Sequence, residues 1–169
     1  HEQVAARWET TLANDARAQV ARDYLAKRGI SDEAVKRFRI GFAPDEWGDT
    51  MNWAKSKKYD DALLEKGGLA IAGDKGHYDR FRGRLIFPIC DEQGRVIGFS
   101  GRVLSAEQKG GKYINSPETP IFSKRRVIYG LHKAKRPILN AKSVIVCEGQ
   151  LDIIACHLAD IENTVAPQG

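Results

Sequence analysis

The order of apolar segments near the C-terminal end constrains the fold more than any other feature of the sequence. Residues Ser143 to Cys147 are typical of a buried strand, Leu151 to Leu158 predict a helix, and Asn163 to Ala166 predict a second strand. This order is a βαβ unit, and one crossover helix cannot cover both faces of a parallel sheet. We therefore expect more strands and helices to follow in the intact protein. The sequence begins at His1 without a methionine and stops at Gly169 after an apolar run, so we expect both ends to be cuts in a longer chain.

The first half of the chain predicts packing helices. Residues Glu2 to Lys27 show a helical pattern that ends before Gly29. Ser31 is a typical N-cap for a second helix, SDEAVKRF, and the two acids in its first turn are favoured there by the helix dipole. Residues 50–57 and 60–66 predict two further short helices.

Basic residues concentrate in the middle of the sequence. Residues 75–136 hold 14 basic and 5 acidic side chains, whereas residues 1–74 have a net charge of −1 and residues 137–169 a net charge of −3. A basic block between neutral and acidic segments suggests that one region contacts a polyanion. A solvated basic face without a partner is the alternative.

Three arginines in this block alternate with apolar or small residues. In an extended chain, a period of two places Arg80, Arg82 and Arg84 on one face of a strand. Residues 85–89 continue the strand, and residues 95–104 predict a second strand after the turn signal DEQG. The two strands therefore predict a β-hairpin.

Three residues of this hairpin predict local irregularity. Pro88 marks a sheet edge or a bulge, because proline cannot donate a ladder hydrogen bond. Gly98 and Gly101 mark a close approach of another backbone or a ligand. Residues 112–124 predict an ordered but irregular stretch, since they include apolar side chains to bury.

Six basic side chains of this region are candidates for phosphate binding. Guanidinium and ammonium groups pair with phosphate oxygens, and the pairing releases counterions. The alternative is an exposed sheet face that its charge keeps soluble. The alternation of arginine with apolar residues and the small number of acids favour phosphate binding. The candidates are Arg80, Arg82, Arg84, Arg102, Lys112 and Lys124.

Glu148 is the candidate for chemistry, because it directly follows an apolar strand and precedes Gly149 and a helix. In open α/β sheets ligands bind beyond the carboxyl ends of parallel strands, where a carboxylate can hold a hard divalent cation. An acid beside an apolar strand is costly unless it faces solvent, a partner or a metal. Asp152 follows one helical turn later, where the helix dipole alone explains a carboxylate.

The sequence excludes several common classes of site. The three cysteines, Cys90, Cys147 and Cys156, lie in or beside apolar runs without CxxC spacing, which indicates buried thiols in a reducing compartment and no zinc site in this segment. GxGxxG and GxxxxGK[ST] motifs are missing, which excludes the usual dinucleotide and P-loop sites. Every apolar run falls short of the roughly 20 residues that span a bilayer, so we expect a cytoplasmic protein without a membrane partner.

Four segments together resemble the RNA polymerase domain of the bacterial DnaG-type DNA primases, over nearly the whole length. YLAKRGISDEAVKRFRIGFAP (24–44) is similar to its helical entry. DRFRGRLIFPICDEQGRVIGFSGRVL (79–104) and KYINSPETPIFSK (112–124) resemble its basic subdomain, and VIVCEGQLDIIACHLADIENTVAPQG (144–169) resembles the opening of its TOPRIM fold. The resemblance implies an α/β protein: a basic α+β subdomain at residues 1–141, followed at residues 142–169 by the first βαβ unit of a truncated TOPRIM fold.

The resemblance also implies roles for individual residues. Glu148 in EGQLD matches the family's catalytic glutamate after the first TOPRIM strand, and a Mg²⁺ or Mn²⁺ ion is the implied cofactor, with Glu148 and then Asp152 as ligands here. The sequence departs from the family at Gln150, where an aromatic residue is usual, and at Leu151, where methionine is frequent. The acids that complete the metal site lie beyond Gly169. The family's basic groove matches Arg80, Arg82, Arg102, Lys112 and Lys124.

The implied function of the intact protein is metal-dependent synthesis of short RNA primers on single-stranded DNA for replication. Its implied partners are the template, nucleoside triphosphates, the RNA primer and, through a domain absent from this segment, the replicative helicase of the primosome. We expect the segment alone to be inactive. Two alternatives stay open: a non-catalytic module that binds single-stranded nucleic acid, and a TOPRIM nuclease or topoisomerase. An Asp-x-Asp pair after a further apolar strand would favour a TOPRIM enzyme over the binding module.

Overall fold

Helices form most of the first third of the chain and strands most of the middle, which gives a mixed α+β fold. The computed structural model describes residues 1–105 and 111–168. The helices are α1 (Glu2–Asn14), η1 (Ala16–Ala18), α2 (Gln19–Lys27), α3 (Asp32–Arg37), α4 (Asp49–Ser56), α5 (Asp61–Lys66), η2 (Lys124–Arg126), α6 (Leu131–Ala141) and α7 (Gln150–Leu158). The strands are β1 (Gly41–Ala43), β2 (Ala70–Gly73), β3 (Gly76–Asp79), β4 (Arg84–Cys90), β5 (Val96–Val103), β6 (Tyr113–Asn115), β7 (Ile145–Val146) and β8 (Thr164–Val165).

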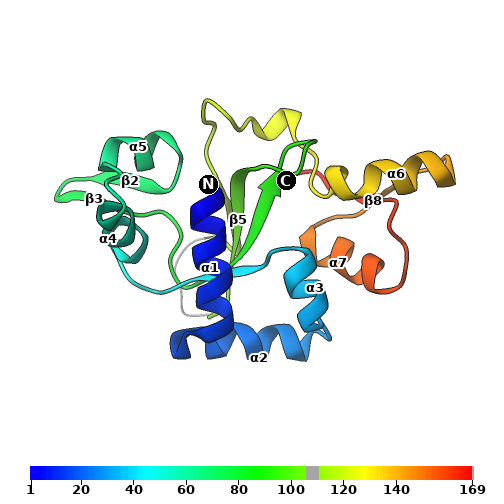
Figure 1. The fold of residues 1–169 in the computed structure, drawn as a ribbon, viewed down its shortest axis with the longest axis horizontal. Coiled ribbons are helices and arrows are strands. Elements are labelled where there is room, and N and C mark those ends of the chain that lie inside the picture. The colour runs from blue at the N-terminus through cyan, green and yellow to red at the C-terminus, as the bar shows by residue number, and fades with distance from the viewer. Residues whose placement is uncertain (106–110, 169) are drawn as a thin grey trace.

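A four-stranded antiparallel sheet with the order β1-β4-β5-β6 forms the centre of the molecule (Figure 1). Its middle pair, β4–β5, is the predicted hairpin. Pro88 lies beyond the part of β4 that pairs with β1, and the β4–β5 register shifts directly after it, between Ile89 and Cys90. Pro88 therefore stands at an open stretch of edge and beside an irregularity, as the sequence predicts.

The central sheet separates two apolar cores, because successive side chains of β4 point to opposite faces. Leu85, Phe87 and Ile89 pack with α2, α3 and α7 in one core. Ile86 packs with α1, α4 and α5 in the other. The run LIFPI is buried on both sides for this reason.

α1 lies so close to β1 that only glycine fits at residue 41. A Cβ atom on Gly41 would lie 2.7 Å from the Cβ atom of Trp8. Trp8 is itself buried, and its ring meets Phe99 of β5 edge to face, with 4.8 Å between centroids. This contact fixes α1 against the sheet.

The helix predicted over residues 2–27 is interrupted at Asp15. This residue has extended backbone angles, and its side chain accepts a hydrogen bond from the backbone N–H of Arg17. An acidic N-cap stabilises the start of a new helical turn, so η1 and α2 leave α1 in a new direction. Ser31 caps α3 as predicted, accepting from the N–H of Ala34 over 3.2 Å.

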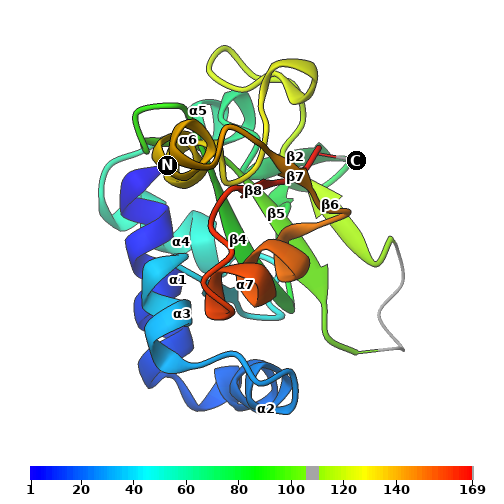
Figure 2. The same ribbon diagram turned by 90° about the vertical axis from the view of Figure 1, so that its right-hand side faces the viewer.

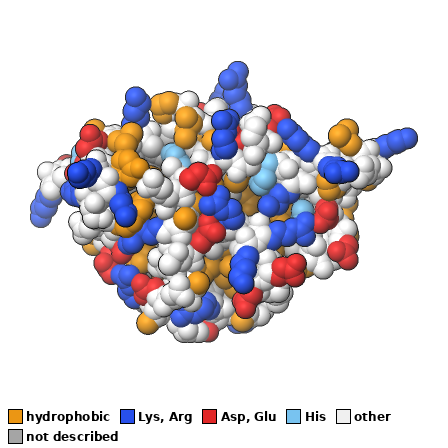
Figure 3. Space-filling model, viewed as in Figure 1, with side chains coloured by type: hydrophobic (Ala, Val, Ile, Leu, Met, Phe, Trp, Pro, Cys, Tyr) orange, Lys and Arg blue, Asp and Glu red, His pale blue; other side chains and the backbone are white. Residues whose placement is uncertain are grey.

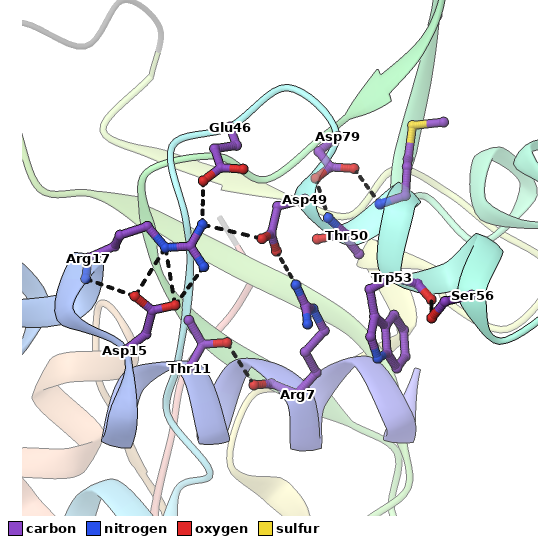
Figure 4. Close-up of polar contacts among 11 residues, drawn as sticks. Arg7, Thr11, Asp15, Arg17, Glu46, Asp49, Thr50, Trp53, Ser56 and Asp79 are labelled. Carbon is purple, nitrogen blue, oxygen red and sulfur yellow. Dashed lines mark hydrogen bonds and ion pairs between the residues drawn. The ribbon is translucent and has the colours of Figure 1, made fainter.

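A network of charged groups ties α1 and η1 to the lobe built from α4, α5 and the β2–β3 hairpin (Figure 4). Arg7 Nη2 donates to Asp49 Oδ2 over 2.5 Å. Arg17 forms ion pairs with carboxylates on both sides of it in space. We call this cluster the paired network; its ion-paired members are Arg7, Asp15, Arg17, Glu46 and Asp49, and Asp79 adjoins them through the backbone of α4.

Asp79, at the end of β3, caps α4 within this network. Its two carboxylate oxygens accept hydrogen bonds from the backbone N–H groups of Thr50, at 2.6 Å, and Met51, at 3.0 Å. The side chain is fully enclosed, and burial raises the pKa of Asp79 to about 6 despite these two bonds.

The predicted βαβ unit is present: β7 and β8 pair in parallel, and α7 connects them. Ile153 and Ile154 of α7 are fully buried in the core on one face of β4. The prediction that residues 143–147 form a buried strand is wrong for the described structure, because Val144 and Val146 are 49% and 68% exposed. A run of apolar residues indicates only that a segment tends to be buried. This strand stays exposed because no described element covers this face of it.

The prediction that a single strand runs from Arg80 through Arg82 and Arg84 to residue 89 is also wrong. β3 ends at Asp79, β4 begins at Arg84, and residues 80–83 between them are irregular. Gly83 has φ = 58°, a left-handed conformation that breaks an extended chain. The three arginines therefore do not share one strand face. No helix among the described residues is long and apolar enough to cross a membrane.

Candidate nucleic-acid interface

A cavity of about 490 Å³ lies between the β5–β6 edge of the central sheet and the start of α7. Its walls come from segments far apart in the sequence: Arg28 after α2, strands β5 and β6, Lys124 in η2, residues 148–152, and residues 167–168. We call it the β6–α7 cavity. α1 and β6 lie on opposite sides of the molecule, so the cavity is remote from the first helix (Figure 2).

The structure brings five of the eight predicted site residues together at this cavity. They are Arg102, Lys112, Lys124, Glu148 and Asp152. Among the described residues, none of the three bases forms an ion pair with an acid of the chain, although both acids line the same cavity. Unpaired charges of both signs at one cavity suit a ligand that carries phosphates and a cation.

Arg102 is held in place by aromatic rings. Its guanidinium carbon lies 4.8 Å from the ring centroid of Tyr24 and 5.3 Å from that of Tyr113, and Nη1 donates to the Tyr113 hydroxyl over 3.0 Å. The residue is only 8% exposed. A guanidinium fixed in this way loses little further freedom when it binds an anion.

Glu148 lies exposed between the end of β7 and the start of α7. In the part of the chain that the structure describes, its carboxylate has no hydrogen-bond partner. Asp152 Oδ2 instead accepts from the backbone N–H of Gly149 over 3.0 Å, which is the helix-cap role that its position in the first turn predicts. The two acids thus differ: Asp152 is partly engaged by its own helix, and Glu148 is open to a ligand.

Arg80 lies next to the cavity but is engaged by its wall. Its Nε and Nη2 atoms donate to the backbone carbonyl of Asn115 over 3.3 and 3.1 Å. Burial lowers the pKa of Arg80 from its ordinary value. We interpret Arg80 as a support for β6 at the cavity rather than as a part of its lining.

Arg84 and Arg82 lie outside the cavity lining, so the structure does not bring them together with the other candidate residues. Arg84 is buried and donates through Nη1 to the carbonyls of Gly101 and Gly111 over 3.0 and 3.2 Å, and burial lowers its pKa. Arg82 lies 3.9 Å above the ring of Trp47, and its Nη1 donates to the carbonyl of Asp79 over 2.7 Å. Alternation in sequence cannot reveal these contacts, because they depend on the turn at residue 83.

Gly101 allows Arg84 to take this buried position. A Cβ atom on Gly101 would lie 2.8 Å from Phe81 Cδ1 and 3.1 Å from Arg84 Cδ. The close approach predicted at this glycine therefore comes from side chains. At Gly98 the neighbours are Phe122, at 3.2 Å, and Ser116 Cβ, at 3.3 Å. Both glycines therefore have close neighbours, but these neighbours are side chains and not the second backbone or the ligand that the sequence predicts.

Sequence reasoning missed the neutral polar residues of the cavity. Ser100, Asn115, Gln150 and Gln168 all line it, and so does Arg28. A glutamine or serine carries no charge pattern or motif that would single it out. One signal was present for Gln150, which stands where the resembled family has an aromatic residue.

The acidic residues of the cavity can supply oxygen ligands to a hard cation, but too few for a complete metal site. Among residues 1–105 and 111–168, no group of three His, Cys, Asp or Glu side chains lies close enough to hold a metal ion. Glu148 and Asp152 supply two carboxylates at the cavity. Proteins bind Mg²⁺ through one or two carboxylates together with substrate phosphates, so this pair fits that ion.

A second cavity, of about 540 Å³, lies on another part of the molecule and differs in character. Apolar residues of α1, α4 and α5, such as Val4, Ala54 and Leu64, line most of it. Only Glu2 and Lys66 among its lining residues carry a full side-chain charge at pH 7. Size alone would favour this cavity, but the chemistry favours the β6–α7 cavity as the site.

Comparison with known sequence families gives one match that spans most of the chain. A family model described as "DNA primase catalytic core, N-terminal domain" matches residues 8–135. The DNA primase of Salmonella typhimurium is 45% identical over 153 residues, which cover 90% of this chain and 26% of that protein. The DNA primase of Streptomyces coelicolor is 39% identical over 167 residues, covering 98% of this chain and 26% of that protein.

Solved structures agree with this match. The RNA polymerase domain of Mycobacterium tuberculosis primase DnaG, in complex with a double-stranded DNA oligomer with a 6-nucleotide overhang, superposes with a TM-score of 0.93 at 36% identity, covering 98% of this chain and 52% of that chain. A DnaG primase catalytic domain bound to single-stranded DNA gives a TM-score of 0.86 at 40% identity, covering 99% and 52%. The chain thus spans about a quarter of these curated relatives and half of these solved domains.

Proposed function

Because the chain belongs to the family of the DNA primase catalytic core, N-terminal domain, we propose that it is part of an enzyme that synthesises short RNA primers on single-stranded DNA. One observation carries the proposal: Arg102, Lys112 and Lys124 converge with Glu148 on one cavity, and none of these charges is paired within the described chain. We assign the template and nucleoside triphosphates as ligands of this surface. Relatives named DNA primase and solved domains with bound DNA support the assignment.

In this proposal the three bases bind phosphate oxygens. Lys112 and Lys124 are exposed and can contact a DNA or triphosphate backbone, whereas Arg102 is held between two tyrosine rings. Sequence fidelity then comes from base pairing with the template, because phosphate contacts carry no sequence information.

Glu148 is the proposed catalytic residue. It would ligate a divalent ion, with Asp152 beside it, or take the proton from the attacking 3′-hydroxyl. A bound Mg²⁺ or Mn²⁺ supplies charge stabilisation for nucleotidyl transfer at the α-phosphate. The position of Glu148 at the end of a parallel strand, open to the cavity, supports this role.

The domain division and the remaining partners are also part of the proposal. We place a basic subdomain at residues 1–141 and the start of a TOPRIM fold at residues 142–169; the family match that ends at residue 135 and the parallel β7–β8 pair support this division. The RNA primer and a replicative helicase are further partners. The protein would act in the cytoplasm, at the nucleoid and the replisome.

Residues 1–169 alone should make no primer in this account, because the described residues supply only two candidate acids, Glu148 and Asp152, at the cavity. Nucleotide incorporation with magnesium or manganese on a single-stranded template measures this. Robust incorporation would contradict our assignment of the metal site.

Glu148→Gln in the full-length enzyme tests the proposal most directly. The change keeps the shape and removes the charge, so priming should fall by orders of magnitude while template affinity stays within about twofold. Glu33→Gln is the matched control, since Glu33 is an exposed glutamate in the first turn of α3. Near-normal priming by a well-folded Glu148→Gln enzyme would favour the non-catalytic binding module instead.

A further inference from the structure

Two of the three cysteines lie close together in the fold. The Sγ atoms of Cys147, directly after β7, and Cys156, in α7, are 4.0 Å apart. Both residues are half-buried and carry free thiols. Cys90, at the end of β4, is also half-buried, but its sulfur contacts neither of the other two in the described structure. The molecule therefore holds one pair of neighbouring thiols and one isolated thiol.

Hydrogen bonds hold the backbone at both members of the pair. The N–H of Cys147 donates to the carbonyl of Val165 over 2.8 Å, which extends the parallel pairing of β7 with β8. The carbonyl of Cys156 accepts from the N–H groups of Ala159 and Ile161, at 3.0 and 2.9 Å, at the end of α7. The two sulfur atoms are therefore neighbours because the βαβ unit is folded.

This pair can be oxidised by a small disulfide such as oxidised glutathione. The thiolate of one cysteine attacks a glutathione sulfur, forms a mixed disulfide and releases one glutathione thiolate. The thiolate of the second cysteine then attacks the protein sulfur of the mixed disulfide and releases the second glutathione. Two electrons pass from the pair to the oxidant, and the two thiol protons end on the released glutathione molecules.

The environment of the pair keeps it reduced under ordinary conditions. Burial, together with the contact to Cys156, raises the pKa of the Cys147 thiol from its ordinary value. Because the thiolate is the reactive form, a raised pKa slows oxidation. Disulfides in reducing compartments are usually transient and sense the redox state. The pair therefore suits a response to a sustained excess of oxidant.

The pair also encloses both acids of the β6–α7 cavity. A bond between residues 147 and 156 closes a loop that contains Glu148 and Asp152. The sulfur atoms must approach by a further ~2 Å to form this bond. Two fully buried isoleucines anchor α7, so the approach moves the turn at residues 147–149 more than the helix. Glu148 lies in this turn and has no hydrogen-bond partner among the described residues to hold its carboxylate.

We propose that Cys147 and Cys156 are a site of reversible oxidation, whose disulfide displaces Glu148 and lowers primer synthesis. The effect on synthesis rests on the proposed function, whereas formation of the disulfide does not. A catalytic group misplaced by about 1 Å can cost roughly 100-fold in rate. The basic residues of the cavity lie on other elements, so binding of the template should be little affected.

The first test locates the disulfide in the chain of residues 1–169. The chain is incubated with excess oxidised glutathione, free thiols are blocked with iodoacetamide, and the peptides are identified by mass spectrometry. Wild type should give two peptides joined through Cys147 and Cys156. Cys156→Ser should instead retain glutathione on Cys147, because the second thiol is missing. Cys90→Ser is the matched control and should form the same disulfide as wild type.

The second test measures primer synthesis by the full-length enzyme, with the disulfide confirmed in the same samples. Oxidised wild type should prime at least about tenfold more slowly than reduced wild type, and dithiothreitol should restore the rate. Its affinity for a labelled single-stranded oligonucleotide should stay within about twofold. Oxidant-treated Cys156→Ser should prime within about twofold of its own reduced form. The comparison of wild type in two redox states does not depend on the folding of a variant, and Cys156→Ala repeats the control with a second substitution.

Four results would overturn the proposal. The first is free thiols at Cys147 and Cys156 after incubation of wild type with excess oxidised glutathione. The second is a major product in which either residue is joined to Cys90. The third is a full priming rate by enzyme that contains the disulfide, and the fourth is an equal loss of priming in oxidised wild type and Cys156→Ser. Failure of the proposed function appears separately, because reduced Glu148→Gln would then prime normally while wild type still forms the disulfide.

Discussion

The paired network and the β6–α7 cavity use the same residue types in opposite ways. In the paired network, Arg7 and Arg17 meet the carboxylates of Asp15, Glu46 and Asp49 (Figure 4). At the cavity, four basic and two acidic residues line one space without forming ion pairs with the chain's own residues in the described part. Charges that satisfy one another hold elements together, whereas charges without a partner remain available to a ligand.

Charge counts alone do not separate these two regions. On the face that carries α1, basic and acidic side chains are interspersed over the surface (Figure 3). The basic block of the sequence divides in the same way: Arg84 donates hydrogen bonds inside the fold, whereas the Lys112 side chain forms no ion pair or hydrogen bond with the described residues. The environment of each charge, and not its sign or its place in the sequence, decides its role.

The largest effect on stability should come from Arg84, the arginine that is satisfied within the fold. Arg84→Ala removes a buried stem and the hydrogen bonds that Nη1 donates to the carbonyls of Gly101 and Gly111. We expect the free energy of unfolding to fall by about 3 kcal/mol, measured by denaturant titration. Arg84→Met keeps the stem and should recover part of the loss. If Arg84→Ala instead left the stability unchanged and weakened DNA binding, Arg84 would be a ligand-binding residue and not a structural one.

An effect on binding without an effect on stability should come from the cavity. Lys112→Ala combined with Lys124→Ala should weaken binding of a labelled single-stranded oligonucleotide by roughly 10- to 100-fold at low salt. The slope of log K against log salt should decrease in magnitude by about 1.4, which corresponds to two phosphate contacts on a single strand.

The control for this charge change is Lys57→Ala combined with Lys75→Ala, two exposed lysines outside the cavity. This pair should leave both the affinity and the slope nearly unchanged. If both double variants weakened oligonucleotide binding equally, the attraction would be diffuse and electrostatic. The β6–α7 cavity would then not differ from the rest of the surface in its binding of DNA.

The smallest effect concerns the pH dependence of the paired network. The pKa of Asp79 is raised from 3.8 to about 6 by burial, so between these pH values the folded state binds more protons than the unfolded state. Its contribution to the free energy of unfolding therefore falls as pH rises from about 4 to about 6, by about 1–2 kcal/mol.

Asp79→Asn isolates this contribution, because it cannot titrate. The difference in unfolding free energy between wild type and variant should follow the falling curve through pH 6 and level off above about pH 7. Comparing the two proteins is necessary, since burial lowers the pKa of His132 to about 4 and gives a contribution of opposite sign in part of this range. A flat difference would show that the two N–H bonds keep Asp79 ionised in the fold.

The predicted fold is most accurate where local patterns decide the structure. The β4–β5 hairpin follows from two apolar runs around a turn signal, and α3 follows from its cap at Ser31. α6 was not predicted, because Pro137 lies inside it and its basic residues obscure the apolar face. The prediction that Arg80, Arg82 and Arg84 share one strand face failed, because residues 80–83 are irregular and Gly83 is left-handed.

The sequence predicts the charged residues of the candidate site but not its neutral residues. Glu148 stands out because an acid after an apolar strand is unusual, and Lys112 and Lys124 stand out in a basic block. Ser100 and Gln168 carry no such signal. Only the folded arrangement shows that they are buried and unpartnered at the same cavity.

The hydrogen bond from Asn115 to the carbonyl of Gln168 also bears on the order of folding. It joins residues 53 positions apart, and it closes the cavity between the central sheet and the end of β8. Closing so long a loop carries an entropic cost that helices such as α1, with local contacts, do not bear. The cavity should therefore be among the last parts of the molecule to form during refolding, and a chain that has already regained its helices would for a time lack the β6–α7 cavity.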